Sequence, residues 1–283
     1  ICEGAIKIDQ LKDFCKKNKI KSLGLSDTYN LSGALEFAEN LSAIGTQPII
    51  GTQILFKYKE LIGLVPLIAK NYNGYKNIIK LSSKSYLDNS EITSPHCMLD
   101  DLINNSDGII VLTGSIKCMF GNLFNKGLLN ETEEILKKLK KKFEGNIYIE
   151  IQRHNDLNEK DFENYNLKIS KKLELPIIAS NEIYYLNQDM YEAHDALMCI
   201  GEKTYVNDAN RIKLTNQHYF KSSDDMIDLF KDLPEALENN FNLPFRCSFK
   251  PSSSKPILPS ISSNDKDANE MLTQLSNEGL EDK

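Results

Sequence analysis

The most constraining feature of the sequence is an alternation of short apolar runs of strand length with longer segments of helical periodicity. The expected strands are 22–26, 49–54, 108–113, 147–151 and 176–180, and the expected helices between them are about 31–41, 132–143 and 159–173. Strand, helix and strand in succession favour parallel pairing, and strands apolar on both faces are typical of sheets covered by helices. The pattern predicts an α/β fold, either a parallel barrel or a doubly wound sheet. The length of 283 residues suits a barrel of about 250 residues.

The two ends of the chain differ from this repeating part in their sequence pattern and composition. A first helix is expected near residue 9, with Asp9 as its N-cap and Leu11, Phe14 and Cys15 as its apolar stripe. Pro- and Ser-rich stretches at 251–256 and 260–263 predict an extended linker, and 267–280 predicts a helix. We therefore expect one domain over 1–250, and a linker with the start of a further domain over 251–283. The absence of Met at position 1 and the helical end suggest a fragment of a longer protein.

Composition narrows the class of protein. The net charge of −6 argues against a strongly basic nucleic-acid clamp, which needs clustered Lys and Arg. No apolar run reaches the roughly 18–20 residues of a membrane span, and the start does not resemble a signal peptide. The six cysteines form no CxxC pair, which favours reduced thiols and a cytoplasmic location.

The carboxyl ends of the expected strands carry polar residues that could form a site. These are Asp27, Gln53, the segment 150–154 and the pair Asn181 and Glu182. In a parallel barrel such residues converge, and converging carboxylates and imidazoles hold metal ions that activate water. The chain has four histidines, and only His154 directly follows a strand. Composition therefore gives weak support to a polynuclear metal site.

Other candidate features have simpler interpretations. The lysines at 137, 138, 140, 141 and 142 share a helix with an apolar stripe, so we expect a solvated outer face. His194 and Asp195 are adjacent on a helix and cannot face each other, which favours a structural cap or surface role. His96 is expected in a loop. Neither GxxxxGK[ST] nor a strand-following GxGxxG is present, which excludes these familiar nucleotide cradles.

Nine segments match one family in order and spacing. They are Gly4–Lys7, Leu25–Ala34, Pro48–Gln53, Asn71–Ser83, Glu150–His154, Pro176–Leu186, Ala193–Ile200, Tyr219–Ser222 and Pro234–Leu237. Together they resemble the PHP (polymerase and histidinol phosphatase) domain, in the form found at the amino end of the bacterial DNA polymerase III alpha subunit. The resemblance covers residues 1 to about 250 and implies a distorted, TIM-like (β/α) barrel. The tail from about Leu258 resembles the entry into the polymerase palm.

The resemblance also implies what the parent enzyme does. It is a DNA-directed DNA polymerase, a nucleotidyltransferase of DNA replication that uses Mg²⁺ and nucleoside triphosphates. Its catalytic carboxylates lie beyond Lys283, so this fragment alone is not expected to polymerise. Implied partners are the rest of the polymerase chain, the proofreading exonuclease and other replisome subunits, and DNA through the parent enzyme.

The family's metal ligands are only partly kept. The corresponding positions in this chain are Asp27, Thr28, Gln53, Glu150, His154, Glu182 and Tyr184. Thr28 and Tyr184 stand where the family has histidine, and Gln53 where it has glutamate. The family's His-x-His pair lies upstream of Ile1. Neutral Thr and Gln are weak ligands, and a Tyr ligand must first lose its proton. We therefore expect a vestigial site without metal, in which Asp27 and His154 persist as hydrogen-bonding core residues.

Three functions follow from the resemblance. The leading hypothesis is an inactive scaffold that braces the polymerase and docks the proofreading exonuclease. The alternative is an active phosphoesterase or 3′–5′ exonuclease in which Asp27, Glu150, His154 and Glu182 bind Zn or Mn. A third is a free-standing enzyme resembling histidinol phosphatase, against which the matches at Asn71–Ser83 and Ala193–Ile200 argue.

Overall fold

The structure, a computed structural model, describes residues 3–89, 94–256 and 267–281. Contacts divide the chain into two compact units, Ile1–Pro251 and Ser252–Lys283. The second unit contains the helix α11 (Ala268–Glu281), and the first contains all the other elements. The division falls one residue from the boundary expected from the sequence. The assignment of the second unit to a further domain stays a prediction.

The first unit combines seven strands with ten α-helices in its described part. The strands are β1 (Ser22–Thr28), β2 (Gln47–Tyr58), β3 (Leu61–Ala69), β4 (Cys97–Met98), β5 (Ile109–Leu112), β6 (Ile147–Ile151) and β7 (Ile177–Ala179). The helices are α1 (Ile8–Lys17), α2 (Ala34–Ser42), α3 (Tyr72–Leu87), α4 (Leu99–Asn104), α5 (Met119–Asn125), α6 (Leu129–Phe143), α7 (Glu159–Leu173), α8 (Tyr191–Glu202), α9 (Ser223–Leu229) and α10 (Pro234–Asn242). Two short 3₁₀ turns, η1 (Gln188–Met190) and η2 (Leu243–Arg246), complete it.

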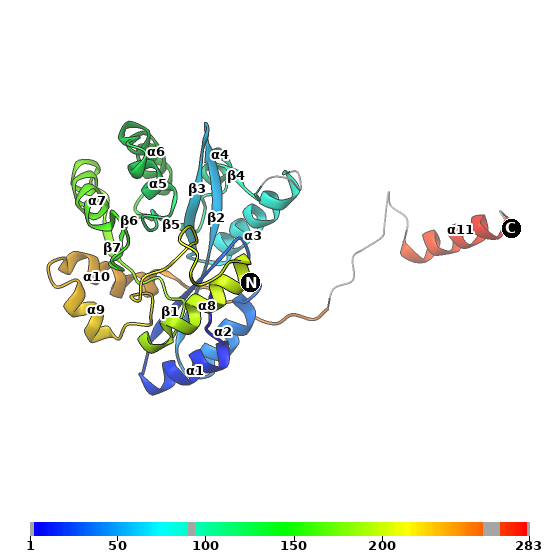
Figure 1. Ribbon diagram of the computed structural model, residues 1–283. Helices are drawn as coiled ribbons and strands as arrows, with labels where there is room; N and C mark the ends of the chain where they lie inside the picture. The colour runs from blue at the N-terminus through cyan, green and yellow to red at the C-terminus, as the bar shows by residue number, and fades with distance from the viewer. Residues whose placement is uncertain (1–2, 90–93, 257–266, 282–283) are drawn as a thin grey trace. The chain divides into compact units, whose positions relative to one another are not determined.

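The strands form one curled sheet in the order β1-β2-β3-β5-β6-β7, with β4 paired to β2 (Figure 1). Four of the six pairings are parallel, and the two that involve β3 are antiparallel. Within the described residues β1 and β7 do not pair, so the sheet is a half-barrel rather than a closed barrel. The largest apolar core contains residues of the central strands and of α3, α5, α6 and α7. The predicted α/β class with a mostly parallel, barrel-like sheet is confirmed.

The β2–β3 hairpin is the main difference from the sequence prediction. The sequence indicated one short strand at 49–54, whereas β2 continues to Tyr58 and turns through Lys59 and Glu60 into β3. Lys59 adopts φ +55°, a left-handed conformation that such turns require but that Gly or Asn normally supplies. Because the turn has neither residue, the sequence carried no hairpin signal. The hairpin makes the sheet mixed rather than wholly parallel.

The accuracy of the other predicted boundaries varies. The prediction was right at both ends for β6 and α7, and α6 starts three residues earlier than expected. The predicted N-cap of α1 was wrong, because the cap residue is Lys7, without a side-chain hydrogen bond. Asp9 lies instead in the first turn, where its charge interacts favourably with the helix dipole.

Two residues at the start of α3, Asn71 and Gly74, have clear structural roles. The Asn71 side chain accepts a hydrogen bond from Gly74 N at 3.0 Å and caps the helix. A Cβ on Gly74 would lie 1.8 Å from the carbonyl oxygen of Gly108, so only glycine fits there. Asn71 and Gly74 therefore bring α3 directly onto the residue before β5.

The edge strand β7 is protected by α10. Asn239 and Asn240 donate hydrogen bonds to the carbonyl oxygens of Ile177 and Ala179 at 2.8 and 2.7 Å. Capping an exposed edge in this way blocks pairing with another chain.

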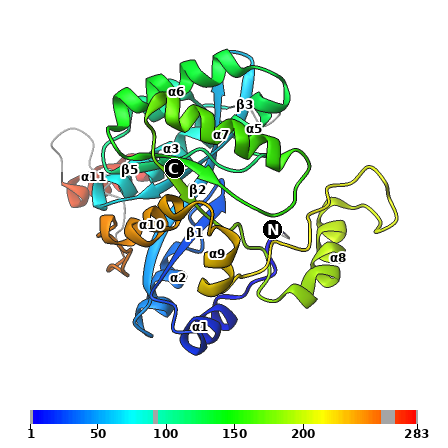
Figure 2. The same cartoon turned by 90° about the vertical axis from the view of Figure 1, so that its left-hand side faces the viewer.

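On another side of the unit, α8 and the loop after it project from the sheet (Figure 2). No described helix is both long and apolar enough to cross a membrane.

Candidate functional site

The predicted site positions all lie in or just beyond β1, β2, β6 and β7. Thr28 ends β1 and pairs in register with Gln53 of β2. Glu150 lies in β6, and His154 follows it by three residues. Glu182 and Tyr184 follow β7. The strand-end rule therefore placed these residues at one end of the half-barrel, and their individual contacts divide them into two groups.

Glu150 is a buried carboxylate that accepts three hydrogen bonds. Its side chain accepts hydrogen bonds from Gly114 N at 2.9 Å, from Gln152 Nε2 at 2.9 Å and from Ser180 Oγ. Burial and the charge of Glu182 raise its pKa. The carboxylate joins β6 to the ends of β5 and β7, and these bonds occupy the oxygens that a cation would need.

His154 is buried by a second histidine that the sequence did not implicate. The rings of His154 and His218 stack with centroids 4.1 Å apart and an interplanar angle of 6°. His154 Nε2 lies 3.0 Å from Asn181 Oδ1, and its Nδ1 has no hydrogen-bond partner and lies 3.7 Å from Glu159 Oε1. Burial lowers the pKa of His218. The pair is thus a packed aromatic contact with its polar atoms only partly satisfied.

Lys221 is a buried cation beside this pair. Its side chain is 6% exposed, and Nζ donates to Asn181 Oδ1 at 3.1 Å and to the carbonyl of Gln217. Burial lowers its pKa to about 8. The oxygen of Asn181 that contacts His154 is therefore also held by an ammonium group of the chain itself.

The β1 and β2 positions are less enclosed than those of β6. Asp27, Thr28 and Gln53 are all half-buried. Gln53 makes only long side-chain contacts, 3.5 Å from Nε2 to Ser26 O and 3.8 Å from Oε1 to Cys118 Sγ. Burial, and next the charge of Glu3, raise the pKa of Asp27. This half of the site has kept space around its side chains.

Tyr29 marks a strained point at the end of β1. It adopts φ +67°, in the left-handed region that is unfavourable for a bulky residue. The Tyr29 amide donates to Gln53 O at 2.8 Å and its carbonyl accepts from Ser82 Oγ at 3.2 Å. These bonds hold the turn in the conformation that a glycine would adopt without strain.

Glu182 and Tyr184 form a local pair. The Tyr184 hydroxyl donates to Glu182 Oε1 at 3.1 Å. Burial, followed by the charge of Glu182, raises the pKa of Tyr184, so the phenol keeps its proton. A protonated phenol is a poor metal ligand, and Tyr184 instead neutralises part of the Glu182 charge.

The side chains present do not fit a cluster of divalent ions. Over residues 3–89, 94–256 and 267–281, no three His, Cys, Asp or Glu side chains are grouped as metal ligands would be. Thr28, Gln53 and protonated Tyr184 are neutral, and Glu150 already accepts three hydrogen bonds within the protein. A site for Zn or Mn needs several deprotonated donors converging on one point.

Sequence reasoning missed three residues of this region. His218 and Lys221 lie in or beside the Tyr219–Ser222 segment, which was noted as a family match without a role. Cys118 follows β5, the one strand expected from the sequence whose carboxyl end gave no candidate. Burial raises the pKa of the Cys118 thiol to about 12, so it is not a thiolate.

The remaining sequence candidates are structural. Of the two roles expected for His194 and Asp195, a structural cap or a surface position, the surface position was wrong, because they are 2% and 8% exposed. His194 Nε2 lies 2.6 Å from Glu3 O, and Asp195 pairs with Arg211 through two contacts of 2.6 Å, since both pack under the loop after α8. The solvated face of α6 is confirmed, with Lys137 and Lys138 paired to Glu133 and Glu134.

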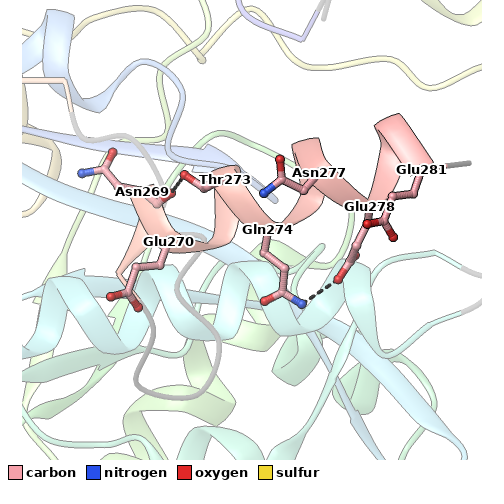
Figure 3. A pocket seen from close by; sticks show the side chains of 7 residues that line it. All are labelled: Asn269, Glu270, Thr273, Gln274, Asn277, Glu278 and Glu281. Carbon is pink, nitrogen blue, oxygen red and sulfur yellow. Dashed lines mark hydrogen bonds between the residues drawn. The ribbon is translucent and has the colours of Figure 1, made fainter. Parts of the chain in front are cut away.

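A surface hollow runs along α11 (Figure 3). It is lined by Asn269, Glu270, Thr273, Gln274, Asn277, Glu278 and Glu281. All seven residues come from one helix, so the hollow is an open surface feature and not a binding cavity.

The fold and the strand-end site together define a PHP-type α/β domain. The PHP domain family model matches residues 1–154, more than half of the chain, and the chain belongs to this family. A solved structure from Bifidobacterium adolescentis, described provisionally as a metal-dependent phosphoesterase, matches 63% of this chain and 82% of its own. Its TM-score is 0.42 and its sequence identity 11%.

Similar curated proteins include DNA polymerase III alpha subunits from several bacteria. The protein from Caulobacter vibrioides is 33% identical over 99% of this chain, and that from Haemophilus influenzae is 32% identical over 99%. The protein from Borreliella burgdorferi is 35% identical over 92%. The chain spans about a quarter of the length of these relatives, 25%, 24% and 24% respectively.

Proposed function

We propose that this chain is the N-terminal PHP region of a DNA polymerase III alpha subunit. The observation that carries the proposal is the similarity to three such subunits along at least 92% of the chain. In this proposal the parent protein is a cytoplasmic DNA-directed DNA polymerase that uses Mg²⁺. Its catalytic carboxylates lie in the three quarters of the protein that follow.

We propose further that the PHP unit is a scaffold without hydrolytic activity. Its support is the chemistry of the strand-end residues. The Glu150 carboxylate, the Asn181 amide and the Tyr184 hydroxyl are engaged in hydrogen bonds within the protein. A cluster of such bonds stabilises the end of the half-barrel and leaves few free donors for a metal.

The docking of a proofreading exonuclease is the third element of the proposal. A hydrolase unit that has lost its ligands but kept its fold can serve as a rigid platform. A separate exonuclease would then supply the editing activity. Comigration of that subunit with the chain on a sizing column would support this element, and separate elution at micromolar concentrations would contradict it.

The decisive experiment compares two activities in the full-length parent protein. Primer extension with Mg²⁺ tests the polymerase assignment. Release of nucleotides from a 3′-labelled strand with Zn or Mn tests the PHP unit, with Asp27→Ala combined with His154→Ala as the matched control. We expect extension, no metal-dependent release above that control, and no stoichiometric metal by elemental analysis.

Two results would overturn the proposal in different ways. Absence of primer extension by a folded parent protein would reject the polymerase assignment. Release of nucleotides that needs Zn or Mn and disappears in the double variant would reject the scaffold. The active phosphoesterase or exonuclease would then be the correct function.

A further inference from the structure

The exposed face of α3 combines aromatic, aliphatic and basic side chains in one stripe. The exposed fractions of Tyr72, Ile79 and Tyr86 are 60%, 41% and 53%. Positions 72, 79 and 86 are seven residues apart, so these side chains lie on one face of the helix. Lys76 and Lys80 are exposed between them. The stripe extends about 21 Å along the helix, from a rise of about 1.5 Å per residue.

The charge of this helix is opposite to that of the whole protein. The segment from Tyr72 to Leu87 contains three lysines and no acidic residue, in a chain of net charge −6. Lys84 is neutralised by Asp88 and Asp101, at 2.6 and 3.5 Å. In the described part of the chain, Lys76 and Lys80 form no ion pair, and Lys76 Nζ lies 4.9 Å above the Tyr72 ring.

The lysines of α6 offer an internal contrast. Lys137 and Lys138 are paired with Glu133 and Glu134 at 2.8 and 3.2 Å, so their charge is balanced within the helix. The one aromatic ring beside these lysines in the described residues is Tyr58 of β2, whose hydroxyl accepts a hydrogen bond from Lys138 at 3.0 Å and donates one to Glu134, so it belongs to the same balanced network. Two unpaired lysines between two exposed tyrosines therefore distinguish α3 from the other lysine-rich helix.

The tyrosine positions are supported from beneath, although the rings are exposed. The Tyr72 ring packs against Phe249 at 5.6 Å, and Phe249 also contacts Tyr75 at 4.6 Å. At the start of the helix, Asn73 donates a hydrogen bond to Asp107 at 3.2 Å. The helix itself is fixed by Asn71 and Gly74. The stripe is thus a firmly held surface.

We propose that this face of α3 binds single-stranded nucleic acid. Exposed tyrosine rings stack on bases, and lysines between them neutralise the phosphates that join those bases. Charge complementarity favours this polyanion over a neutral apolar segment. The face also lies outside the strand-end site, so the two can be tested separately. The inference goes beyond the proposed function, and the primer-extension result does not depend on it.

The test measures binding of a fluorescent dT strand of about 12 nucleotides to the 283-residue chain by anisotropy at several salt concentrations. We expect Tyr72→Ala combined with Tyr86→Ala to weaken binding about 10-fold or more, since each stacked base contributes substantially. Tyr72→Phe with Tyr86→Phe keeps the rings and should bind like the unchanged chain. Thermal melting verifies that all variants remain folded, and Tyr86→Ala alone avoids the Phe249 contact.

The lysine variants separate specific from general electrostatic binding. Lys76→Gln with Lys80→Gln should lower the slope of log K against log salt by about 1.4, at about 0.7 per phosphate contact. Lys137→Gln with Lys138→Gln on α6, where both lysines are ion-paired, is the matched control and should leave affinity unchanged. Equal losses in both lysine pairs, or unchanged binding in the tyrosine-to-alanine variant, would overturn the proposal. Capture of an acidic helical peptide in place of the dT strand would also overturn it and identify a protein partner.

Discussion

The two halves of the strand-end site have diverged in physical character. In the β6–β7 half, Glu150 and His154 are 5% and 1% exposed, and Glu150 is held by three hydrogen bonds. In the β1–β2 half, Asp27, Thr28 and Gln53 are half-buried, and the Gln53 side-chain contacts are long. Two of the three neutral replacements of family ligands, Thr28 and Gln53, lie in this second half. The comparison suggests that one half has become part of the core, while the other remains a surface.

The largest expected effect is on the β6–β7 half, at Glu150. Glu150→Ala leaves the Gly114 amide and the Ser180 hydroxyl without their acceptor in a buried setting. We expect a loss of about 3 kcal/mol in the free energy of unfolding, measured by urea titration. Glu150→Gln keeps an acceptor of similar size and should lose about 1 kcal/mol. A loss below about 1 kcal/mol in Glu150→Ala would show that this half is not core.

An intermediate effect is expected at Lys221, and it depends on pH. Burial lowers its pKa to about 8 from an ordinary value of 10.5. Between these values the unfolded chain holds the proton more tightly than the folded one, so stability rises with pH across this window. Below about pH 8 both states carry the charge, and the folded state bears a cost of roughly 2 kcal/mol.

The measurement is the free energy of unfolding at pH 7.5, 8.5 and 9.5. The unchanged protein should gain stability relative to Lys221→Met as pH rises, because only the former can release this proton. Lys137→Met, at an exposed position of α6, is the control and should give a constant difference. A constant difference for Lys221→Met as well would mean that its ammonium group is not buried against the β6–β7 half.

The sequence predicted the regular parts of the molecule because local chemistry determines them. β6 has isoleucine at every second position and is buried along its whole length, and α7 has a continuous helical stripe, so both boundaries were readable. The β2–β3 hairpin could not be predicted in this way. Its turn residue Lys59 adopts a left-handed conformation, and the turn has no Gly or Asn that would have indicated it. The strand-end rule found Asp27, Glu150 and His154. It could not find His218 or Lys221, whose positions depend on how a loop far beyond β6 in the sequence packs back onto His154.

The smallest expected effect is at Asp27, in the open half. Burial and the charge of Glu3 raise its pKa, so the folded state favours the protonated form. The stabilising contribution is therefore complete below the unfolded pKa of 3.8 and is lost as pH rises through the folded pKa. At pH 7 the charge is a small cost, and Asp27→Asn should gain about 0.5 kcal/mol in urea titrations with chelator present.

Glu3→Gln tests whether the charge of Glu3 contributes to the raised pKa of Asp27. It removes the neighbouring charge, so it should change stability at pH 7 in the same direction as Asp27→Asn, and the two gains should not add fully. Repeating the titrations with Mn²⁺ distinguishes a surface carboxylate from a ligand. If Asp27 binds a metal, Mn²⁺ will stabilise the unchanged protein, and Asp27→Asn will lose that gain. Equal curves with chelator and with Mn²⁺ are expected, because the neutral Thr28 and Gln53 beside Asp27 give a cation only one charged donor in this half.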